Sequence, residues 1–550
     1  MTSANIIILF ISLRTVCGSD LFHVKSKITF TPDNADAADY FGYSVMSSEL
    51  GLIIGAPKAR STIKKKIIAP GAVFKCTVQL DNSNATCGRL ASLPRSTLMS
   101  DFYVDDMWYG ATLATVPNKK LLVCAPRVTT PYQGNRHLLA NGVCTLRGSD
   151  REFAFKPLSD KVRQAFRTDG SRKEYGEYES HMNYFAYGQS GMSAKVTENS
   201  TIIIGAPGVL QWTGAVIEYK FMPSTFFLVR LQNQNPYFSP DLGPDDYFGY
   251  SVESGIFDES GLVLYVGGAP RSKGGYGQVL VFTPSKLENE PLNVKAKLVG
   301  PQLGSYFGAS LCTTDLDGDG LSDLLVGAPN YAIKGGMIKY DQGAVFVYLS
   351  RKEDFRFVLQ GSGFVRGSGT SGARFGTAVA GLGDIDGDGY NDVAIGAPWE
   401  NDGMGVVYVY RGTSYGLNNR YSQRILAEGA MGFGISISKG YDVDNNKCND
   451  LAIGAHKSKT AYLYRSIPTL QVLSTIKVPN AKSLNLTISS FPALFCIVVP
   501  PNHHWSDLEL NLKATISVDP EGNRAKPWVK LISSSLQNLA WIGVKNKSSK

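Results

Sequence analysis

Three acidic loops in the second half of the chain have the residue types and the spacing of calcium-binding loops. Each has oxygen-bearing side chains at positions 1, 3, 5 and 9, and Ca²⁺ prefers several such hard oxygen ligands. With a backbone carbonyl at position 7, the candidate ligands are Asp315, Asp317, Asp319, Leu321 and Asp323 in the first loop, Asp384, Asp386, Asp388, Tyr390 and Asp392 in the second, and Asp442, Asp444, Asn446, Cys448 and Asp450 in the third. The sequence therefore predicts three bound Ca²⁺ ions.

These loops differ from EF-hands. An EF-hand loop has a glutamate at position 12 and flanking helices. Position 12 here is Val326, Ile395 or Ile453, inside an apolar run that ends in Gly-Ala-Pro or Gly-Ala-His. We therefore expect hairpin turns whose ions stiffen the fold. The third loop should bind most weakly, because Asn446 replaces a carboxylate and Lys447 replaces a turn glycine.

The acidic loops belong to a longer repeat that must position them. An aromatic–glycine pair or a similar pair is followed by an apolar run that ends in Gly-Ala-Pro or a variant of it. The pairs are Phe41-Gly42, Tyr109-Gly110, Tyr187-Gly188, Phe248-Gly249, Phe307-Gly308, Phe375-Gly376 and Phe433-Gly434, and the first and last residues of the run endings are Gly55 and Pro57, Cys124 and Pro126, Gly205 and Pro207, Gly268 and Pro270, Gly327 and Pro329, Gly396 and Pro398, and Gly454 and His456. Repeated short strands predict an all-β fold, with a seven-bladed β-propeller over residues 19–465.

A fourth loop of the same length has lost the pattern. Its ligand positions are Ile256, Asp258, Ser260, Leu262 and Leu264. One carboxylate is too few to hold Ca²⁺, so we expect this turn to bind no ion.

The two ends of the chain have other compositions. An apolar stretch from Ile6 to Leu13, followed by small residues at Cys17 and Gly18, predicts a signal peptide over residues 1–18. Residues 466–550 contain alternating strands without the repeat, which predicts a partial β-sandwich. This pattern ends early, so the chain is expected to be a truncated product or a head fragment that has no transmembrane segment of its own.

Several features indicate passage through the secretory pathway. The pairs Cys76–Cys87 and Cys124–Cys144 are close in sequence and suit hairpin disulfides in an oxidising compartment. The N-glycosylation acceptors are Asn84, Asn199, Asn485 and Asn546.

Composition argues against some classes of function. The net charge is +8, but there is no long basic block, so we expect no nucleic-acid partner. Secreted phospholipases that carry similar repeats need a His- and Asp-rich catalytic domain. The six histidines here are scattered, without metal-ligand spacing: His23, His137, His181, His456, His503 and His504. We expect neither an enzyme nor a small-molecule substrate.

The repeats and their calcium loops resemble the head of an integrin α subunit of the type that lacks an I domain. The resemblance covers about residues 20–465, and residues from Ser466 look like the start of the integrin thigh domain. It implies an adhesion-receptor subunit at the extracellular face of the plasma membrane, which pairs with an integrin β subunit and binds extracellular-matrix proteins at the seam between the two. A secreted binding module or decoy that acts without a β chain is the alternative.

The resemblance also implies which residues meet partners. A β-subunit arginine would enter an aromatic cup at the propeller centre, to which Tyr109, Tyr187, Trp212 and Phe248 are candidate contributors, although blade packing explains each of them equally well. In members that bind Arg-Gly-Asp ligands, acids before the fourth repeat meet the ligand arginine. Asp245 and Asp246 are the candidates here, but they depart from the family's pattern by one residue. The ligand class and the identity of the β chain stay open.

Overall fold

The computed structural model describes most of residues 21–467. The described ranges are 21–61, 67–78, 84–91, 103–132, 137–149, 151–158, 185–222, 227–234, 240–283, 292–333, 339–352, 355–467, 473–477 and 494–498. The predicted signal peptide, Asn485, Asn546 and most of the predicted sandwich lie outside them. The chain divides into a larger unit, Asp20–Ile385 with Gly389–Ile467, and a smaller unit that comprises Met1–Ser19, Asp386–Asp388 and Pro468–Lys550.

Strands dominate the larger unit. Its eight-stranded sheet has the order β2 (Ser44–Ser48), β3 (Gly51–Ala56), β4 (Ala72–Cys76), β5 (Asn84–Ala91), β1 (Ile28–Pro32), β32 (Thr460–Tyr464), β31 (Leu451–Ala455) and β30 (Phe433–Ile437). Among the described residues there are five further sheets of four strands. The first two comprise β6 (Thr112–Val116), β7 (Lys120–Ala125), β10 (Val143–Arg147) and β11 (Glu152–Phe155), and β12 (Ser193–Val196), β13 (Thr201–Ala206), β14 (Ala215–Met222) and β15 (Phe227–Gln234). The other three comprise β16 (Ser251–Ile256), β17 (Val263–Ala269), β18 (Gln278–Thr283) and β19 (Asn293–Val299); β20 (Ser310–Thr314), β21 (Asp323–Ala328), β22 (Ala344–Arg351) and β23 (Arg356–Val365); and β24 (Ala378–Gly383), β25 (Asp392–Ala397), β26 (Val406–Tyr410) and β29 (Gln423–Ile425).

The remaining elements are short. They are the hairpins β8 (Thr130–Tyr132) with β9 (His137–Leu139) and β27 (Gly412–Thr413) with β28 (Gly416–Leu417), and the helical turns η1 (Ala35–Ala37), α1 (Val209–Trp212) and α2 (Ser272–Gly275). In the smaller unit, β33 (Leu473–Lys477) pairs antiparallel with β34 (Leu494–Val498). That single pair leaves the predicted sandwich a prediction. No helix in the described part of the chain has the length and apolar character needed to cross a membrane.

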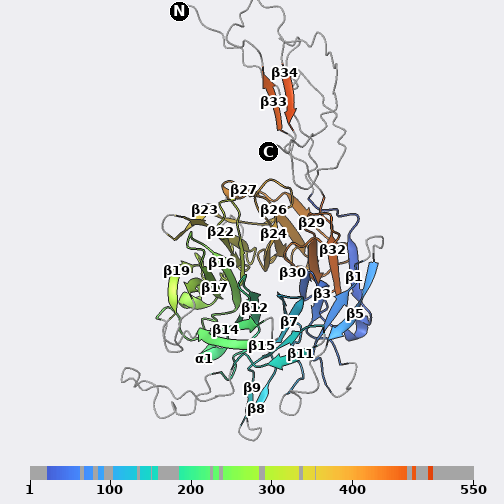
Figure 1. Cartoon of the computed structure of the whole chain (residues 1–550), viewed down its shortest axis with the longest axis vertical. Coiled ribbons are helices and arrows are strands. Elements are labelled where there is room, and N and C mark those ends of the chain that lie inside the picture. The colour runs from blue at the N-terminus through green and yellow to red at the C-terminus, as the bar shows by residue number, and fades with distance from the viewer. Residues whose placement is uncertain are drawn as a thin grey trace, which may run out of the picture. The chain divides into compact units, whose positions relative to one another are not determined.

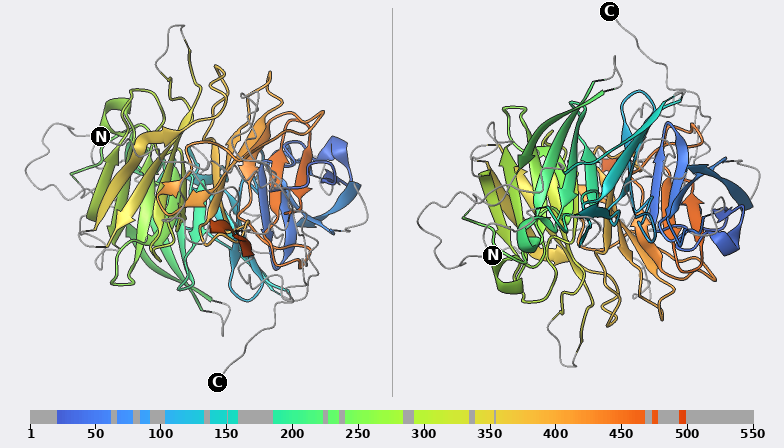
Figure 2. Two further views of the ribbon diagram at one scale, coloured as in Figure 1. Left: turned by 90° about the horizontal axis from the view of Figure 1, so that it is seen from above. Right: turned by 90° about the horizontal axis from the view of Figure 1, so that it is seen from below.

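The sheets of the larger unit are arranged around a common centre, as a propeller requires (Figure 1). The innermost strands contact one another in a closed series, in the order β2, β6, β12, β16, β20, β24 and β30, after which β30 contacts β2. Figure 2 shows the same sheets from above and below, standing side by side. The predicted all-β propeller arrangement is therefore confirmed.

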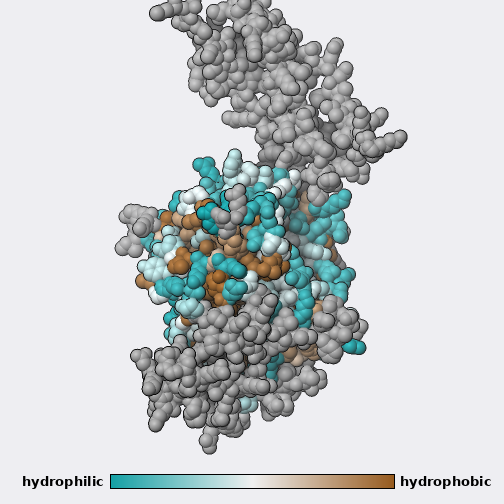
Figure 3. Space-filling model, turned by 60° about the vertical axis from the view of Figure 1, so that its left-hand side comes forward, coloured by the Kyte–Doolittle hydropathy of each residue, from teal (hydrophilic) through white to brown (hydrophobic). Residues whose placement is uncertain are grey.

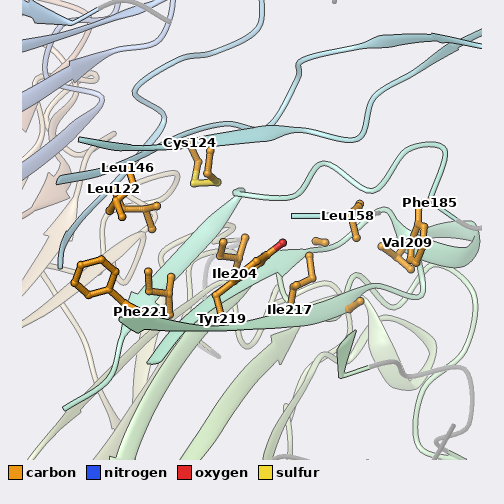
Figure 4. Packing of buried hydrophobic residues seen from close by; sticks show 14 of the residues in the cluster. Leu122, Cys124, Leu146, Leu158, Phe185, Ile204, Val209, Ile217, Tyr219 and Phe221 are labelled. Carbon is orange, nitrogen blue, oxygen red and sulfur yellow. A yellow bond between two sulfur atoms is a disulfide. The ribbon is translucent and has the colours of Figure 1, made fainter. Parts of the chain in front are cut away.

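The second strand of each sheet is buried on both faces. Every residue of β13, β21 and β25 is buried, which explains why these runs are continuously apolar rather than alternating. Figure 4 shows one core between neighbouring sheets, where Ile204, Tyr219 and Phe221 lie near Leu122 and Cys124.

The outer strands are different. Burial alternates along β19, and Val299 at its end is 48% exposed. The side that carries β19 comes forward in Figure 3, where hydrophobic and hydrophilic residues are mixed on the surface.

Within the described residues, disulfides join the two predicted cysteine pairs. Cys76 pairs with Cys87 across β4 and β5, and Cys124 pairs with Cys144 across β7 and β10. Both therefore cross-link directly opposed residues of adjacent strands. Cys312 and Cys448 are free and buried.

Neighbouring sheets meet where a glycine carbonyl of one lies against a glycine of the other. A Cβ at Gly205 of β13 would lie 2.0 Å from the Gly249 carbonyl oxygen of the next repeat. The same contact recurs between Gly55 and Gly110, Gly268 and Gly308, Gly327 and Gly376, and Gly396 and Gly434, and between Gly454 and Gly42 at the two ends of the eight-stranded sheet. Only a residue without a Cβ permits this approach, which explains the glycine of the Gly-Ala-Pro endings.

A serine hydroxyl completes most of these contacts. The Ser193 hydroxyl donates to the Gly249 carbonyl at 3.0 Å. Equivalent donors reach the same carbonyl position in other repeats: Ser44 to Gly110, Ser251 to Gly308, Ser310 to Gly376 and Ser436 to Gly42. The second repeat differs, because Cys124 occupies the glycine position and Thr112 donates to the Met192 carbonyl at 3.1 Å.

The third repeat begins three residues later than the sequence pattern indicates. The glycines that carry the inter-sheet carbonyl have φ between 84° and 91°, and Gly191 has φ 91°. The Gly191 amide donates to Gly205, as the Gly249 amide donates to Gly268. The structural counterpart of the aromatic–glycine pair is therefore Ser190-Gly191 and not Tyr187-Gly188.

The first and last parts of the repeat region are joined directly. β1 pairs antiparallel with β32 and parallel with β5, which makes the eight-stranded sheet continuous. The Gln423 side chain accepts hydrogen bonds from the Leu21 and Phe22 amides, both at 2.9 Å, and donates to the Phe22 carbonyl. Leu21 and Phe22 are fully buried there.

An ionic cluster joins the inner strands. Glu253 of β16 pairs with Lys195 of β12, and Lys439, which follows β30, lies 3.7 Å from the same carboxylate. Burial alone would raise the pKa of Glu253, but the two lysines lower it below its ordinary value. The Thr313 hydroxyl of β20 donates to Glu253 at 3.3 Å. The cluster thus ties together parts of the chain that are distant in sequence.

Replacing Gly205 by alanine should destabilise the larger unit. The new methyl group would overlap the Gly249 carbonyl, and such overpacking costs about 1–3 kcal/mol. Gly88→Ala is the matched control, since a Cβ there would meet nothing within 4 Å. Urea unfolding of the two variants measures the effect, and equal midpoints would show that the glycine contact does not limit packing.

Candidate functional site

The three acidic loops occupy one kind of connection. They join the first strand of a sheet to the second: β20 to β21, β24 to β25, and β30 to β31. The aromatic–glycine pair precedes the first strand and Gly-Ala-Pro ends the second. In an antiparallel pair, the acidic loop therefore lies at the opposite end from both motifs.

Three carboxylates converge in each loop. Side chains at positions 1, 3 and 9 place ligand oxygens within 4.8 Å of one another, and the groups are Asp315, Asp317 and Asp323; Asp384, Asp386 and Asp392; and Asp442, Asp444 and Asp450. Position 5 is not part of these groups. The Asp319 carboxylate accepts from the Leu321 amide at 2.9 Å, and the Asn446 side chain accepts from the Cys448 amide at 2.8 Å. Ligation by position 5 and by the position 7 carbonyl stays a prediction.

The aspartate at position 9 also anchors the loop. Asp323 is fully buried, and its two oxygens accept from the Leu316 amide at 2.8 Å and the Ser350 amide at 2.9 Å. The other loops repeat both bonds, with Asp392 accepting from Ile385 and Gly412, and Asp450 accepting from Val443 and Ser466. Each position 9 carboxylate thus fixes its own turn and the end of the third strand or the residues just after it.

The electrostatics of the loops favour a cation. Burial, partly offset by hydrogen bonds, raises the pKa of Asp323 to about 7 and that of Asp450 to about 6. Burial, followed by the nearby Asp319, also raises the pKa of Asp317. One Asp317 oxygen is buried without a hydrogen-bond partner, while the other lies 3.2 Å from Arg351. Clustered carboxylates with an unsatisfied buried oxygen suit a divalent ion.

In the fourth turn, hydrogen bonds within the turn satisfy the single carboxylate without a cation. The Asp258 carboxylate accepts hydrogen bonds from the Ser260 amide at 3.0 Å and from the Ser260 hydroxyl. Leu264, at position 9, is 2% exposed. No group of three metal-ligating acids occurs in the turn from Ile256 to Leu264, all of which the structure describes.

The structure places the four predicted partner aromatics in two environments. Tyr109 and Phe248 are fully buried between sheets, and the Tyr109 hydroxyl is hydrogen-bonded to Thr145 at 2.9 Å. These two side chains pack the core and do not reach a partner, which corrects that part of the prediction. Tyr187 is 55% exposed, and its ring stacks on Trp212 with centroids 6.5 Å apart.

The two predicted acidic residues, Asp245 and Asp246, also lie in different environments. The Asp246 carboxylate accepts from the Gly243 amide at 2.9 Å and the Ser272 hydroxyl at 2.8 Å, and burial raises its pKa. It is therefore engaged within the chain. Asp245 is exposed, with φ 65°.

A larger group of aromatic residues was not predicted from the sequence. Tyr40, Trp108, Tyr247 and Tyr306 each directly precede the aromatic–glycine pair, and all have φ between 61° and 64°. These four residues could have been predicted from their shared position within the repeat, but not from their residue types. Their rings form contacts that extend to the following residues: Tyr43 with Trp108, Tyr40 and Tyr43 with His456, Trp399 with His456, Trp212 with Tyr247, and Tyr250 with Tyr306.

His456 lies at the centre of several of these rings. It replaces the proline that ends the other repeats. Burial, followed by the nearby Lys457, lowers the pKa of His456 to about 4. The imidazole is therefore neutral at physiological pH and acts as one more aromatic group.

Two predicted glycosylation acceptors lie within the described residues. Asn84 begins β5, Asn199 lies in the turn between β12 and β13, and both side chains are exposed. Exposure is required of an acceptor, but their modification stays a prediction.

Comparison with known proteins identifies the repeat. Residues 307–348 and 375–410 match the FG-GAP repeat. The chain is 33% identical to integrin alpha-PS3 of Drosophila melanogaster over 509 residues, which cover 83% of this chain and 43% of that protein. It is 36% identical to integrin alpha-4 of Xenopus laevis over 467 residues, which cover 80% and 41%, and 30% identical to integrin alpha-V of Gallus gallus over 493 residues, which cover 83% and 44%. The chain thus spans less than half the length of these relatives.

The stabilisation that Ca²⁺ gives should grow as the pH rises from about 5.5 to about 7.5. The pKa values of Asp323 and Asp450 are raised in the cation-free folded state, so protons compete with the ion below about 7 and about 6. Without the ion, the contribution of these two carboxyl groups to the free energy of unfolding falls as the pH rises through their pKa values of about 6 and about 7. Thermal unfolding in Ca²⁺ and in chelator, compared at each pH, measures the difference.

A control variant removes another titrating group. His456→Gln should leave that difference unchanged, because the lowered pKa of His456 acts equally with and without the ion. A difference that is constant or shrinks with rising pH would contradict proton competition at the loops.

Proposed function

Because the FG-GAP repeats and the integrin α relatives support an integrin α head, we propose that the chain serves as the partner- and ligand-binding head of a cell-adhesion receptor. The observation that carries the proposal is the similarity over 80% or more of the chain. We place this head at the extracellular face of the plasma membrane.

We infer that the propeller has seven blades. The eight-stranded sheet divides naturally into two blades of four strands, β2 to β5 and β30 to β32 with β1. The parallel contact between β1 and β5 joins them, whereas strands within each blade are antiparallel. The proposed domains are a signal peptide over residues 1–18, the propeller over residues 19–465 and an incomplete thigh-like domain over residues 466–550.

Three Ca²⁺ ions would occupy the acidic loops and stiffen the blades that carry them. The carboxylates at positions 1, 3 and 9 supply the converging ligands. Side chains at position 5 and carbonyls at position 7 would complete the shells by small rotations of the turns. The ions would therefore act at one end of the propeller, away from the aromatic residues.

Native mass spectrometry should count these ions. We expect three bound Ca²⁺ ions in the full chain and two in the Asp315→Ala variant, which loses position 1 of the first loop. Asp258→Ala should still bind three, because its turn has a single carboxylate. Four ions in the unaltered chain would contradict the assignment of the fourth turn.

The aromatic residues at the other end mark the proposed docking face for an integrin β subunit. Their rings come from several repeats and meet around His456 and Tyr43. Extracellular-matrix ligands would bind at the seam, beside Tyr187 and Trp212. Of the two acids expected to meet a ligand arginine, Asp246 is held in hydrogen bonds within the chain and Asp245 is exposed, so Asp245 would be the residue that meets an Arg-Gly-Asp ligand.

Co-purification tests the proposed pairing. A tagged full chain, captured from cells that naturally produce it, should bring down an integrin β chain detectable by mass spectrometry. The alternative function, a soluble binder without a β chain, predicts a monomer that still binds matrix proteins. Recovery of such a monomer alone would overturn the heterodimer proposal.

A further inference from the structure

One residue of each acidic loop contacts the turn of the preceding repeat. Position 8 lies between the predicted carbonyl ligand at position 7 and the carboxylate at position 9, and it is Ser322, Asn391 or Asn449. The Ser322 amide donates to the Ile256 carbonyl at 2.7 Å, and the Asn391 amide donates to the Asp315 carbonyl at 3.3 Å. Ile256 and Asp315 both hold position 1 of their turns. The same bond therefore links position 8 of one turn to position 1 of the turn before it.

This bond orients a predicted calcium ligand. The Asn391 amide and the Tyr390 carbonyl belong to one trans peptide group, which is planar, so its N–H and C=O point in opposite directions. While the amide is bonded to the preceding turn, the carbonyl points away from that turn. The Ser322 amide orients the Leu321 carbonyl in the same way. Both carbonyls hold position 7, so each preceding turn sets the direction of a predicted ligand.

The third loop contacts the second through a side chain. The Nδ2 atom of Asn449 donates to the Leu382 carbonyl at 2.8 Å, close before position 1 of the second loop. A Cβ at Gly383 would lie 2.7 Å from this nitrogen, so a residue without a side chain is needed beside it. The Gly440 amide donates to the Gly381 carbonyl at 3.1 Å in the same region. The second and third loops are thus joined at the place where the first and second loops are joined.

The fourth turn takes part in this series although it lacks calcium ligands. Its Ile256 amide donates to the Ser322 hydroxyl at 3.2 Å, which adds a second bond in the opposite direction to the first. The first and second loops also pack closely, since a Cβ at Gly318 would lie 3.1 Å from the Tyr390 ring. The fourth turn and the three acidic loops therefore form an unbroken series of contacts.

We propose that neighbouring calcium loops bind their ions cooperatively through these position 8 contacts, an inference that rests on the proposed Ca²⁺ sites and deepens it. When the Tyr390 carbonyl takes its place as a ligand, the Asn391 amide is held against Asp315, whose carboxylate is a ligand in the first loop. The coupling is reciprocal, so ligation in the first loop favours ligation in the second by the same factor. The fourth turn orients the Leu321 carbonyl without an ion of its own.

Variants that keep two of the three loops test the proposal. Asp442→Ala leaves the first and second loops, and Asp315→Ala leaves the second and third. Asp384→Ala leaves the first and third, which belong to repeats that are not neighbours. Each substitution removes a carboxylate and keeps the backbone groups that connect the turns. Native mass spectrometry of the full chain during a Ca²⁺ titration then gives the populations with no ion, one ion and two ions.

These populations report coupling directly. The ion-free population multiplied by the doubly loaded population, and divided by the square of the singly loaded population, has an upper limit for two independent sites, whatever their affinities. We expect both neighbouring pairs of loops to exceed this limit about fivefold or more, as coupled sites in proteins do. The first and third loops should stay at or below the limit, because no position 8 contact joins them directly.

Asn449→Ala breaks one link without removing a predicted ligand. In the Asp315→Ala variant it should bring the ratio for the second and third loops down to near the limit. Asn34→Ala is the matched control, because the Asn34 side chain accepts only from the Ala37 amide within its own turn, and the ratio should not change. In the otherwise unaltered chain, Asn449→Ala should raise the share of partly loaded molecules, which tests the link even if a two-loop variant does not fold.

The outcomes distinguish this inference from the proposed Ca²⁺ sites. If each two-loop variant binds two ions but the neighbouring pairs stay at or below the limit, cooperativity is wrong and the three sites stand. If the two-loop variants bind fewer ions than that, the assignment of the loops fails and the coupling fails with it. An unchanged ratio in Asn449→Ala, or equal coupling between the first and third loops, would show that position 8 is not the link.

Discussion

The approach of one sheet's glycine carbonyl to the next sheet's glycine sets the geometry of the larger unit. A side chain at Gly205 has no room beside the Gly249 carbonyl. Because this contact recurs in all repeats but the second, where Cys124 faces Gly191, most neighbours meet at a similar close distance, and a ring can close. The serine that donates to the same carbonyl satisfies an acceptor that the close packing would otherwise remove from water.

This packing leaves two different groups of residues at the opposite ends of the inner strands. At one end, the rings of positive-φ residues such as Tyr40 and Tyr247 contact aromatic rings from other repeats. At the other end, the turns carry the converging aspartates. Asp323 links its turn to Ser350, near the end of the third strand of the same sheet. A cation held there would therefore act on the sheet as a whole, while leaving the aromatic face free for other molecules.

Local chemistry made much of the fold predictable. The acidic loops, the apolar runs and the paired cysteines depend on neighbouring residues, and the structure reproduces these features. The third repeat was misplaced because its position needs a glycine with positive φ, which Gly191 supplies without an aromatic partner. The aromatic–glycine pair Tyr187-Gly188 lies three residues before this position.

The candidate partner residues were less predictable for a different reason. Tyr109 and Phe248 are indistinguishable by type from exposed aromatic residues, and only the packing of adjacent sheets buries them. Asp246 is engaged by Ser272, which reaches it from beyond the next two strands. Such pairings depend on the tertiary structure, which spacing along the chain does not specify.

The pairing of β1 with β32 has a consequence for biosynthesis. Ile28 is opposite Leu463, so the sheet that closes the ring needs segments made at very different times. Until the later segment emerges, β1 and the earlier sheets expose unpaired edges, which are prone to wrong association. Contacts so distant in sequence also fold slowly. Closure of the ring is therefore exposed to wrong association for as long as β32 is absent.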